Sequence, residues 1–365
     1  NMTDDTSLLV TTVRNEGHTI LEWVAHHRLC GFDRIQIYQN DSTDTTVKTL
    51  HTLAGLGVIE YHENRHKRGG HQMRAYRRAS RSEAYAECDW CMVLDADDFL
   101  NVVVGGGKVA DLIAACPEKA DAILVNQRSF GSSGHQYLDR SLVTERFGRA
   151  EPAGDIVTTR MTPLKPLFKT GAFSRPGAHL PRDPAIETPV HCNGSGLVDG
   201  EFRRKGGRSF DPEGRAFAQV HHYGLRDLAS FLVRHVEDGE PAHRDEGLEI
   251  WRELDRNDEE DHTLVSRGPA LWEEMQRLDE MSDGLLLRLR QKAIRQWRVA
   301  AKNLAERKDI TALRDAILGK VPELVLKPES MVTPFRLPQP LPVFSSVRNT
   351  FEDAAPDKPH KVAAS

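Results

Sequence analysis

The chain has 365 residues, with 49 lysines and arginines against 54 aspartates and glutamates, and therefore a formal net charge of −5. That length fits one enlarged domain with an accessory segment, or two domains. The near-neutral charge argues against a protein dedicated to nucleic acid or to a basic membrane surface. Apolar residues make up 39% of the chain, which allows a sizeable core and excludes wholesale disorder.

Membrane and export signals are missing from the sequence pattern. No apolar run approaches the ~18 residues of a membrane-spanning helix, and residues 1–5 are polar and acidic, unlike a signal peptide. The cysteines are too few for a disulfide framework, and Cys88 and Cys91 lack the second pair that a zinc site needs. We therefore expect a cytoplasmic protein whose thiols are reduced and packed in the core.

The first part of the chain alternates strand and helix patterns. Short β-branched and apolar runs predict strands at 7–13, 34–38, 58–61, 90–94 and 122–125. Apolar residues at helical spacing predict helices at 19–29, 47–53 and 72–87. This alternation predicts an α/β fold, with a mainly parallel sheet and helices on both faces. Ligands bind such sheets beyond the carboxyl ends of the strands.

The rest of the chain changes character twice. Residues 126–220 are rich in glycine and proline and poorly periodic, which is typical of binding loops. Apolar stripes then predict helices at 271–281, 285–304 and 309–318. Prolines accumulate beyond Val321 and predict an extended tail.

Polar clusters follow three predicted strand ends, at 14–16, 39–41 and 95–98. The last is the most informative, because an apolar strand delivers Asp95 and Asp97 to its carboxyl edge. Hard cations such as Mg²⁺ and Mn²⁺ prefer oxygen ligands and leave positions open for substrate phosphates. An aspartate-rich turn or helix N-cap would show the same residues, so the pattern alone leaves both interpretations open.

Basic residues gather just before that aspartate-rich segment. They are Arg65, Lys67, Arg68, Arg74, Arg77, Arg78 and Arg81. A solvated helix face explains most of them. One or two of the guanidinium groups could bind a diphosphate, which their planar, forked donors fit well.

Several segments, taken in order, resemble family 2-like glycosyltransferases with a GT-A fold. They are residues 12–16, 20–28, 31–33, 40–44, 70–72, 90–97, 130–135, 145–147 and 220–223. The resemblance spans about residues 7–235, nearly two-thirds of the chain. Each segment alone is a weak signal, whereas the ordered set is specific.

This resemblance implies a nucleotide-sugar donor, a divalent cation (Mn²⁺ or Mg²⁺) and an inverting transfer. Asp95-Ala96-Asp97 matches the DxD motif of the family, so Asp97 would bind the metal, and Asp95 would reach the ribose or share the metal. His222 matches the late histidine that often completes the metal site. The adjacent His221 could take the same role, and a structural histidine is the alternative for either.

The resemblance also locates the nucleotide pocket. The positions that line it are matched by Arg14, Asn15, Glu16, Asn40 and Gln72. Gln39 departs from the pattern, where an aspartate is commoner. The resemblance therefore leaves open whether the donor is a UDP-sugar or a GDP-sugar.

Sugar transfer also needs a base for the acceptor hydroxyl, and a carboxylate within hydrogen-bonding reach is the usual one. Glu145 is the first choice, because it lies in a segment of the acceptor half that resembles the family. A salt bridge to a neighbouring arginine is the alternative role for Glu145. The rival bases are Asp155, Asp199 and Glu201.

Together these predictions give a GT-A-like catalytic domain over 1–235, with a nucleotide-binding part at 7–125 and an acceptor part at 126–235. A helical segment at 236–320 and a proline-rich tail at 321–365 follow. The helical segment could be a homodimer contact, an acceptor platform or a peripheral dock on the inner face of the cell membrane.

We expect a metal-dependent, inverting glycosyltransferase that acts on a hydroxyl of a glycan or glycolipid. A nucleotidyltransferase-like enzyme could use the same sheet, metal and diphosphate pocket on a sugar phosphate. A non-catalytic nucleic-acid-binding protein is a third hypothesis. The acidic net charge and the lack of interleaved exposed aromatic residues argue against a nucleic-acid partner.

Overall fold

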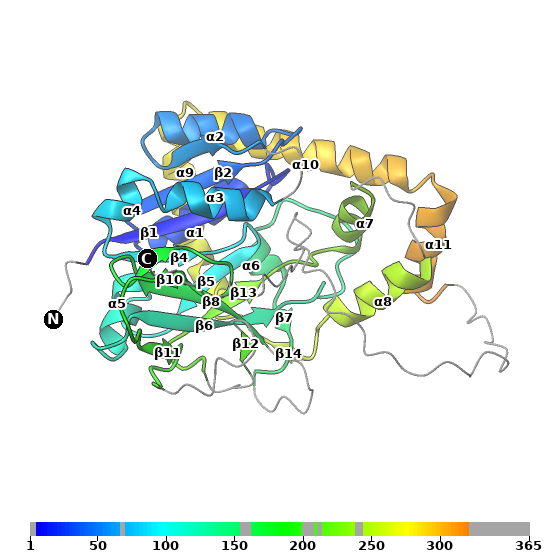
Figure 1. Ribbon diagram of the computed structural model, residues 1–365. Coiled ribbons are helices and arrows are strands. Elements are labelled where there is room, and N and C mark those ends of the chain that lie inside the picture. Colours follow the sequence, from blue (N-terminus) through cyan, green and yellow to red (C-terminus); the bar gives the residue numbers. More distant parts are fainter. Residues whose placement is uncertain are drawn as a thin grey trace, which may run out of the picture.

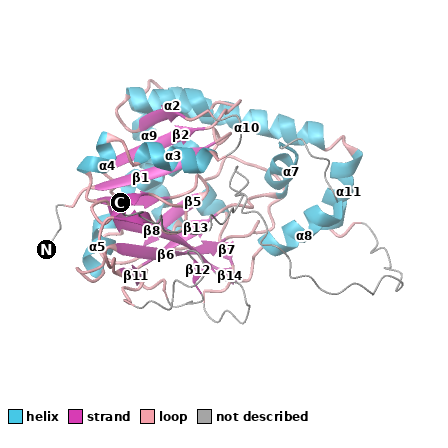
Figure 2. Cartoon of the chain, in the orientation of Figure 1, coloured by secondary structure: helices cyan, strands magenta, loops and turns pink. Residues whose placement is uncertain are grey.

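The computed structural model describes residues 5–65, 70–153, 162–198, 208–209, 214–237 and 244–320. A ten-stranded sheet forms its centre, with helices packed on both faces (Figures 1 and 2). In pairing order, the strands are β3 (Glu60–Glu63), β2 (Arg34–Gln39), β1 (Ser7–Val13), β4 (Trp90–Val93), β8 (Thr162–Lys169), β6 (Ala122–Ser129), β13 (Ala218–His222) and β5 (Asp98–Val102), with β11 (His191–Asn193) beside β6 and β12 (Arg208–Ser209) beside β8.

Most strand pairs in this sheet are parallel. Parallel pairing joins β1 to β2 and β4, β2 to β3, and β6 to β11 and β13. The antiparallel pairs are β4–β8, β6–β8, β8–β12 and β5–β13. Two small sheets pair β9 (Phe173–Arg175) with β10 (Arg182–Pro184) and β7 (Arg149–Ala150) with β14 (Glu259–Glu260). The predicted α/β class, with a mainly parallel sheet, is confirmed.

Two hydrophobic clusters explain why β1 carries apolar side chains on both of its faces. Its alternating side chains place Leu9 and Val13 in one cluster and Leu8 and Val10 in the other. The first cluster is covered by α1 (Ile20–Leu29), α2 (Thr46–Gly55) and α5 (Val109–Ala115), and the second by α3 (His71–Ala79) and α4 (Glu83–Glu87). Helices on both faces are therefore confirmed.

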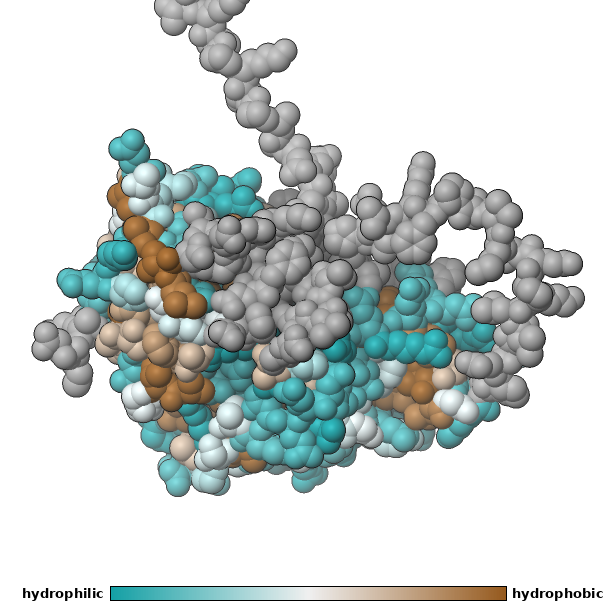
Figure 3. Space-filling view, turned by 90° about the horizontal axis from the view of Figure 1, so that it is seen from below, coloured by the Kyte–Doolittle hydropathy of each residue, from teal (hydrophilic) through white to brown (hydrophobic). Residues whose placement is uncertain are grey.

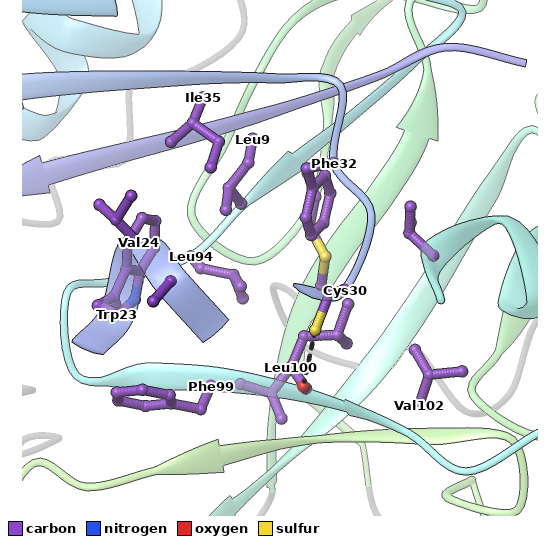
Figure 4. Packing of buried hydrophobic residues seen from close by; sticks show 14 of the residues in the cluster. Leu9, Trp23, Val24, Cys30, Phe32, Ile35, Leu94, Phe99, Leu100 and Val102 are labelled. Atoms are coloured by element: carbon purple, nitrogen blue, oxygen red, sulfur yellow. Dashed lines mark hydrogen bonds between the residues drawn. The ribbon is translucent and has the colours of Figure 1, made fainter. Parts of the chain in front are cut away.

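Figure 4 shows how α1 is seated on the sheet. Trp23 and Val24 lie beside Leu94, and the Cys30 thiol contacts the Leu100 carbonyl oxygen at 3.6 Å. Each large apolar side chain buried there contributes roughly 1.5–3 kcal/mol. The packing fixes α1 against β5, the strand that begins at the aspartate-rich turn.

The structure corrects several predicted boundaries. The predicted helix at 72–87 is wrong as a single element, because Ser82 caps a new helix, α4, by accepting a hydrogen bond from the Tyr85 amide at 3.2 Å. β3 starts two residues later than expected, and β6 continues to Ser129 rather than ending at 125.

Part of the segment predicted to be irregular lies in the middle of the sheet. β8 pairs with both β4 and β6 although it contains Pro163 and Pro166. Proline cannot donate to a strand ladder, so its presence argued against a central strand. Pairing with β4 involves only 167–169, beyond both prolines.

The helices near the end of the described chain pack onto the sheet layers. α9 (Gly268–Met281) contacts α1, and α10 (Leu285–Leu304) contacts α2 and α7 (Leu228–Glu237). α7, α8 (Arg244–Leu254) and α11 (Lys308–Ile317) share a smaller apolar cluster, on the right of Figure 1. The predicted helices at 271–281, 285–304 and 309–318 are confirmed to within three residues at either end. The predicted tail at 321–365 lies outside the described residues.

From below, the surface that can be described is largely hydrophilic, with hydrophobic residues in a few separate spots (Figure 3). In the described part of the chain, no helix combines the length and the apolar character that crossing a membrane requires.

Candidate active site

Strand pairing assembles the candidate site at the carboxyl edge of β4. The chain turns tightly between Val93 and Asp98, and β5 then runs antiparallel to β13. In this register His222 lies opposite Asp98, although 124 residues separate them. The Trp23 indole nitrogen, on α1, holds the turn by donating to the carbonyl oxygens of Asp95 at 3.2 Å and Asp98 at 2.9 Å.

Asp97, Asp98 and His222 form a group suited to a metal ion. One ligand atom from each lies within 4.8 Å of the others. His222 Nδ1 is 2.9 Å from Asp98 Oδ1 and 3.7 Å from Asp97 Oδ1. That Asp97 oxygen is buried and has no hydrogen-bond partner in the described part of the chain. A buried carboxylate oxygen left unpaired is costly, and a cation would satisfy it.

The electrostatics of this group also favour a bound positive charge. Burial raises the pKa of Asp97 although the charge of His222 opposes the shift. For His222, burial favours the neutral ring, but Asp97 and Asp98 outweigh it and raise the pKa to about 9. Two carboxylates and an imidazole therefore fit a divalent cation, and the imidazole suits Mn²⁺ better than Mg²⁺.

Lys165 is the main site residue that sequence reasoning missed. Its ammonium group, almost fully buried, lies 2.5 Å from Asp95 Oδ2 and 2.8 Å from Asp98 Oδ2. Burial opposes ionisation of Asp98, but Lys165 and His222 prevail and hold its pKa well below the ordinary value. Lys165 stands between two prolines in a segment without periodicity, so no local pattern marked it.

The structure places Asp95 beside the three-residue group rather than inside it. Its carboxylate contacts Lys165 and accepts a hydrogen bond at 3.0 Å from the amide of Gln72, on α3. Asp98, which the sequence analysis did not choose, occupies the place beside Asp97 that was predicted for Asp95. Gln72 thus contacts Asp95, and its predicted role in the nucleotide pocket stays a prediction.

The residues predicted for the nucleotide pocket, except Gln72 on α3, lie at the carboxyl ends of β1 and β2. Asn15 joins the two strand ends: its backbone is left-handed at φ 55°, and its side-chain oxygen accepts from the Thr43 amide at 2.8 Å. Asn40 accepts from the Asn64 amide at 2.8 Å. Arg14 Nε and Asn40 Nδ2 have no hydrogen-bond partner among the described residues. Those two nitrogens can donate to a ligand.

Glu16 is engaged within the protein. It accepts from Arg226 at 2.8 Å and Arg234 at 2.6 Å through different oxygens, and from the Thr19 hydroxyl at 2.6 Å. Burial would raise the pKa of Glu16, but the two arginines outweigh it and lower the pKa to about 2. Its observed contacts thus make Glu16 the link between the end of β1 and the 224–237 segment.

This link predicts an acid-sensitive contribution to stability. The folded pKa lies below the unfolded value of 4.5, so the contribution is complete above pH 4.5 and is lost as the pH falls toward 2. We expect Glu16→Gln to lower the free energy of unfolding strongly at pH 7. The difference in that free energy between the variant and the natural protein should be about 1 kcal/mol smaller at pH 3.5. Urea unfolding at both pH values measures it. Glu118→Gln, at an exposed position, is the control, and a gap that is independent of pH would contradict the ion-pair assignment.

Two predicted roles are not brought together with the metal group. Glu145, on α6 (Val143–Arg146), directs its carboxylate against Gly268 at the start of α9. Its role as the base stays a prediction without a contact to support it. The rival bases Asp155, Asp199 and Glu201 lie outside the described residues.

His221 points away from His222 and stacks on Phe130, with ring centroids 4.4 Å apart. Burial lowers the pKa of His221 to about 3. His221 is therefore structural.

Comparisons with known proteins match the part of the chain that holds most of these residues. A model of glycosyltransferase family 92 matches residues 11–137. A glycosyltransferase family 92 protein of Ricinus communis is 26% identical over 156 residues, which are 37% of this chain and 25% of that protein. The match thus spans about a quarter of that relative. These matches support a glycosyltransferase, and the family they name is 92 rather than a family 2-like one.

Similar solved structures include TarS of S. aureus, which covers 82% of this chain and 90% of its own at 12% identity and a TM-score of 0.33. TarS in complex with UDP gives 13% identity, the same coverage and a TM-score of 0.31. A putative glucose-1-phosphate thymidylyltransferase of Bacillus anthracis covers 46% of this chain and 72% of its own at 10% identity and a TM-score of 0.27. TM-scores this low do not decide between fold families.

Proposed function

We propose that the protein is a metal-dependent glycosyltransferase that moves a sugar from a UDP- or GDP-sugar to a hydroxyl of a glycan or glycolipid, with inversion. The observation that carries this proposal is the group of Asp97, Asp98 and His222, in which a buried carboxylate oxygen has no hydrogen-bond partner in the described part of the chain. The glycosyltransferase family match covers Asp97 and the predicted nucleotide pocket, which supports this function over others at the same sheet edge.

The residues of the site would divide the work as follows. Asp97, Asp98 and His222 would hold the cation, which when bound neutralises the charge that develops on the departing diphosphate. Lys165 keeps Asp98 ionised and, with Gln72, holds the carboxylate of Asp95, which would contact the donor. The free donors of Arg14 and Asn40 would bind the nucleotide. Asp98, Lys165 and His222 are already held by ion pairs and hydrogen bonds, and electrostatic stabilisation of a transition state gains most from groups held in advance.

A nucleotidyltransferase acting on a sugar phosphate would need a comparable metal and diphosphate site. The family match favours sugar transfer. Binding of nucleic acid has no supporting contact in the described structure, and the predicted basic residues Lys67 and Arg68 lie outside it. On α3, Arg78 is partly occupied by the Glu63 carbonyl oxygen at 2.5 Å and by the Tyr38 ring.

Thermal unfolding tests the proposal. We expect Mn²⁺ with UDP or GDP to raise the melting temperature, because a ligand that binds only the folded protein stabilises it. With the nucleotide at a hundred times its dissociation constant, the free energy of unfolding should rise by about 2–3 kcal/mol. UDP in excess EDTA should act much less, and DNA or RNA should not act at all. A panel of nucleotide sugars, assayed for hydrolysis, then identifies the donor. Stabilisation by nucleic acid, with none by either nucleotide, would refute the proposed function.

A further inference from the structure

A small pocket lies between the start of α1, the 138–147 segment, residues 226–227 and α10. Arg146, Arg226 and Arg290 line it together with His18 and two aspartates, Asp139 and Asp227. Three guanidinium groups thus face two carboxylates among the lining residues, while Glu16 pairs with Arg226 and the charge of Glu22 acts on Arg290 from outside the pocket. Arg226 and Arg290 are 1% and 4% exposed, so their charges are almost fully removed from water.

The unsatisfied atoms of the pocket are all hydrogen-bond donors. Arg226 Nε and Nη2, Arg290 Nε and His18 Nδ1 are buried, and none has a hydrogen-bond partner among the residues that the structure describes. Arg226 donates to His18 Nε2 at 3.1 Å, so the neutral ring carries its proton on Nδ1. Burial lowers the pKa of His18 to about 3, which keeps that ring neutral. An oxyanion accepts hydrogen bonds through all of its oxygens and would satisfy these donors.

The backbone at Arg226 is held in a strained form. Its φ is 60°, in the left-handed region that a residue with a long side chain rarely adopts. Such strain costs on the order of 1–3 kcal/mol and persists where the surroundings impose it, which is typical of binding sites. The Glu16 contact holds one edge of this guanidinium group and leaves Nε and Nη2 free.

The position of the pocket relates it to the acceptor rather than to the nucleotide. Arg226 follows His222 by four residues, and the charges of Glu16 and then Asp97 raise its pKa against the effect of burial. The opposite walls come from 138–147, in the predicted acceptor part, and from α10. Asn40 and Gln72, predicted for the nucleotide, are not among the lining residues.

We propose that this pocket is an oxyanion subsite, formed by Arg226, Arg290 and His18, that receives a phosphate or carboxylate group of the acceptor. The identification of the ligand as an acceptor rests on the proposed glycosyltransferase function. The binding of an oxyanion does not, because it follows from the buried donors alone.

The probes are inorganic phosphate and glucuronate, added to the full chain in EDTA without nucleotide, against sodium chloride of equal ionic strength. We expect at least one probe to raise the melting temperature in a saturable way. Arg290→Gln should weaken its apparent binding about tenfold or more, whereas Arg295→Gln, at an exposed position of the same helix, should leave it unchanged. Ile294→Phe narrows the pocket without changing its charge and should also weaken binding of the probe. This variant replaces Arg290→Gln in the test if Arg290→Gln does not fold.

The outcomes separate the sources and the two proposals. A stronger effect of phosphate assigns a phosphate-bearing acceptor, and a stronger effect of glucuronate assigns a carboxylate. No stabilisation by either probe, or equal stabilisation in the pocket variants, overturns the subsite. Displacement of the bound probe by UDP or GDP with Mn²⁺ would overturn the acceptor assignment and give the pocket to the donor. The titrations with phosphate and glucuronate contain neither metal nor nucleotide. Their result therefore tests the oxyanion subsite even if the proposed glycosyltransferase function is wrong.

Discussion

Asp97→Asn is expected to abolish transfer without weakening the fold. The substitution removes a charge from the group formed with Asp98 and His222, so activity with Mn²⁺ and the donor should fall roughly a hundredfold or more. Burial raises the pKa of Asp97, which means that its ionised form is unfavourable in the metal-free protein. The melting temperature without metal should therefore stay the same or rise. Initial rates of donor hydrolysis, together with thermal unfolding, measure both effects.

Asp98→Asn is the informative comparison, because it neutralises the adjacent carboxylate. Asp98 is paired with Lys165 and His222 and accepts from the Gln127 amide at 2.7 Å, so its replacement should lower stability as well as activity. The opposite responses of two neighbouring aspartates would separate a residue that waits for a cation from one that the protein already pairs. Normal turnover in Asp97→Asn would remove the metal assignment altogether.

Much of the fold was predictable because its elements have local patterns. The run at 7–13 is apolar on both faces, as a strand buried between two helix layers must be, and it forms β1 with the predicted bounds. β8 was not predictable in this way, since two prolines and a lysine contradict the pattern of a central strand. Its place depends on pairing with β4 and β6, which are distant in sequence.

The site divides in the same manner. Asp97 and His222 were predictable from a resemblance to known motifs, and the structure brings them to within 3.7 Å of each other. The exchange of Asp95 for Asp98 was not, because it depends on Lys165, which enters from β8 and holds Asp95 away from the group. Glu16 illustrates a second limit. Its sequence segment matches a nucleotide pocket, whereas its carboxylate binds Arg226 and Arg234, which lie at least 210 residues further along the chain. A single sequence shows which residues can pair, and long-range packing decides which of them do.

Lys165→Met should have the largest effect on stability of any single change at the site. Methionine has a similar length but no charge. The replacement would leave the carboxylates of Asp95 and Asp98 buried beside each other without the lysine ammonium group. Removing one partner of a buried ion pair costs about 3–5 kcal/mol. We expect urea unfolding of the metal-free protein at pH 7 to show a loss of that size. The loss should shrink in acid, where the two carboxylates take up protons.

Lys169→Met, four residues along the same strand, is the matched control. Lys169 is about one-third exposed and lies 3.6 Å from Asp121, so screening by water should limit its loss to about 1 kcal/mol or less. Mn²⁺ supplies a second test, because a divalent cation beside Asp98 replaces part of the missing charge and should stabilise Lys165→Met more than the natural protein. Equal losses for the two lysine variants would show that Lys165 fills space and does not compensate the carboxylates, and the division of roles proposed for the site would fail with it.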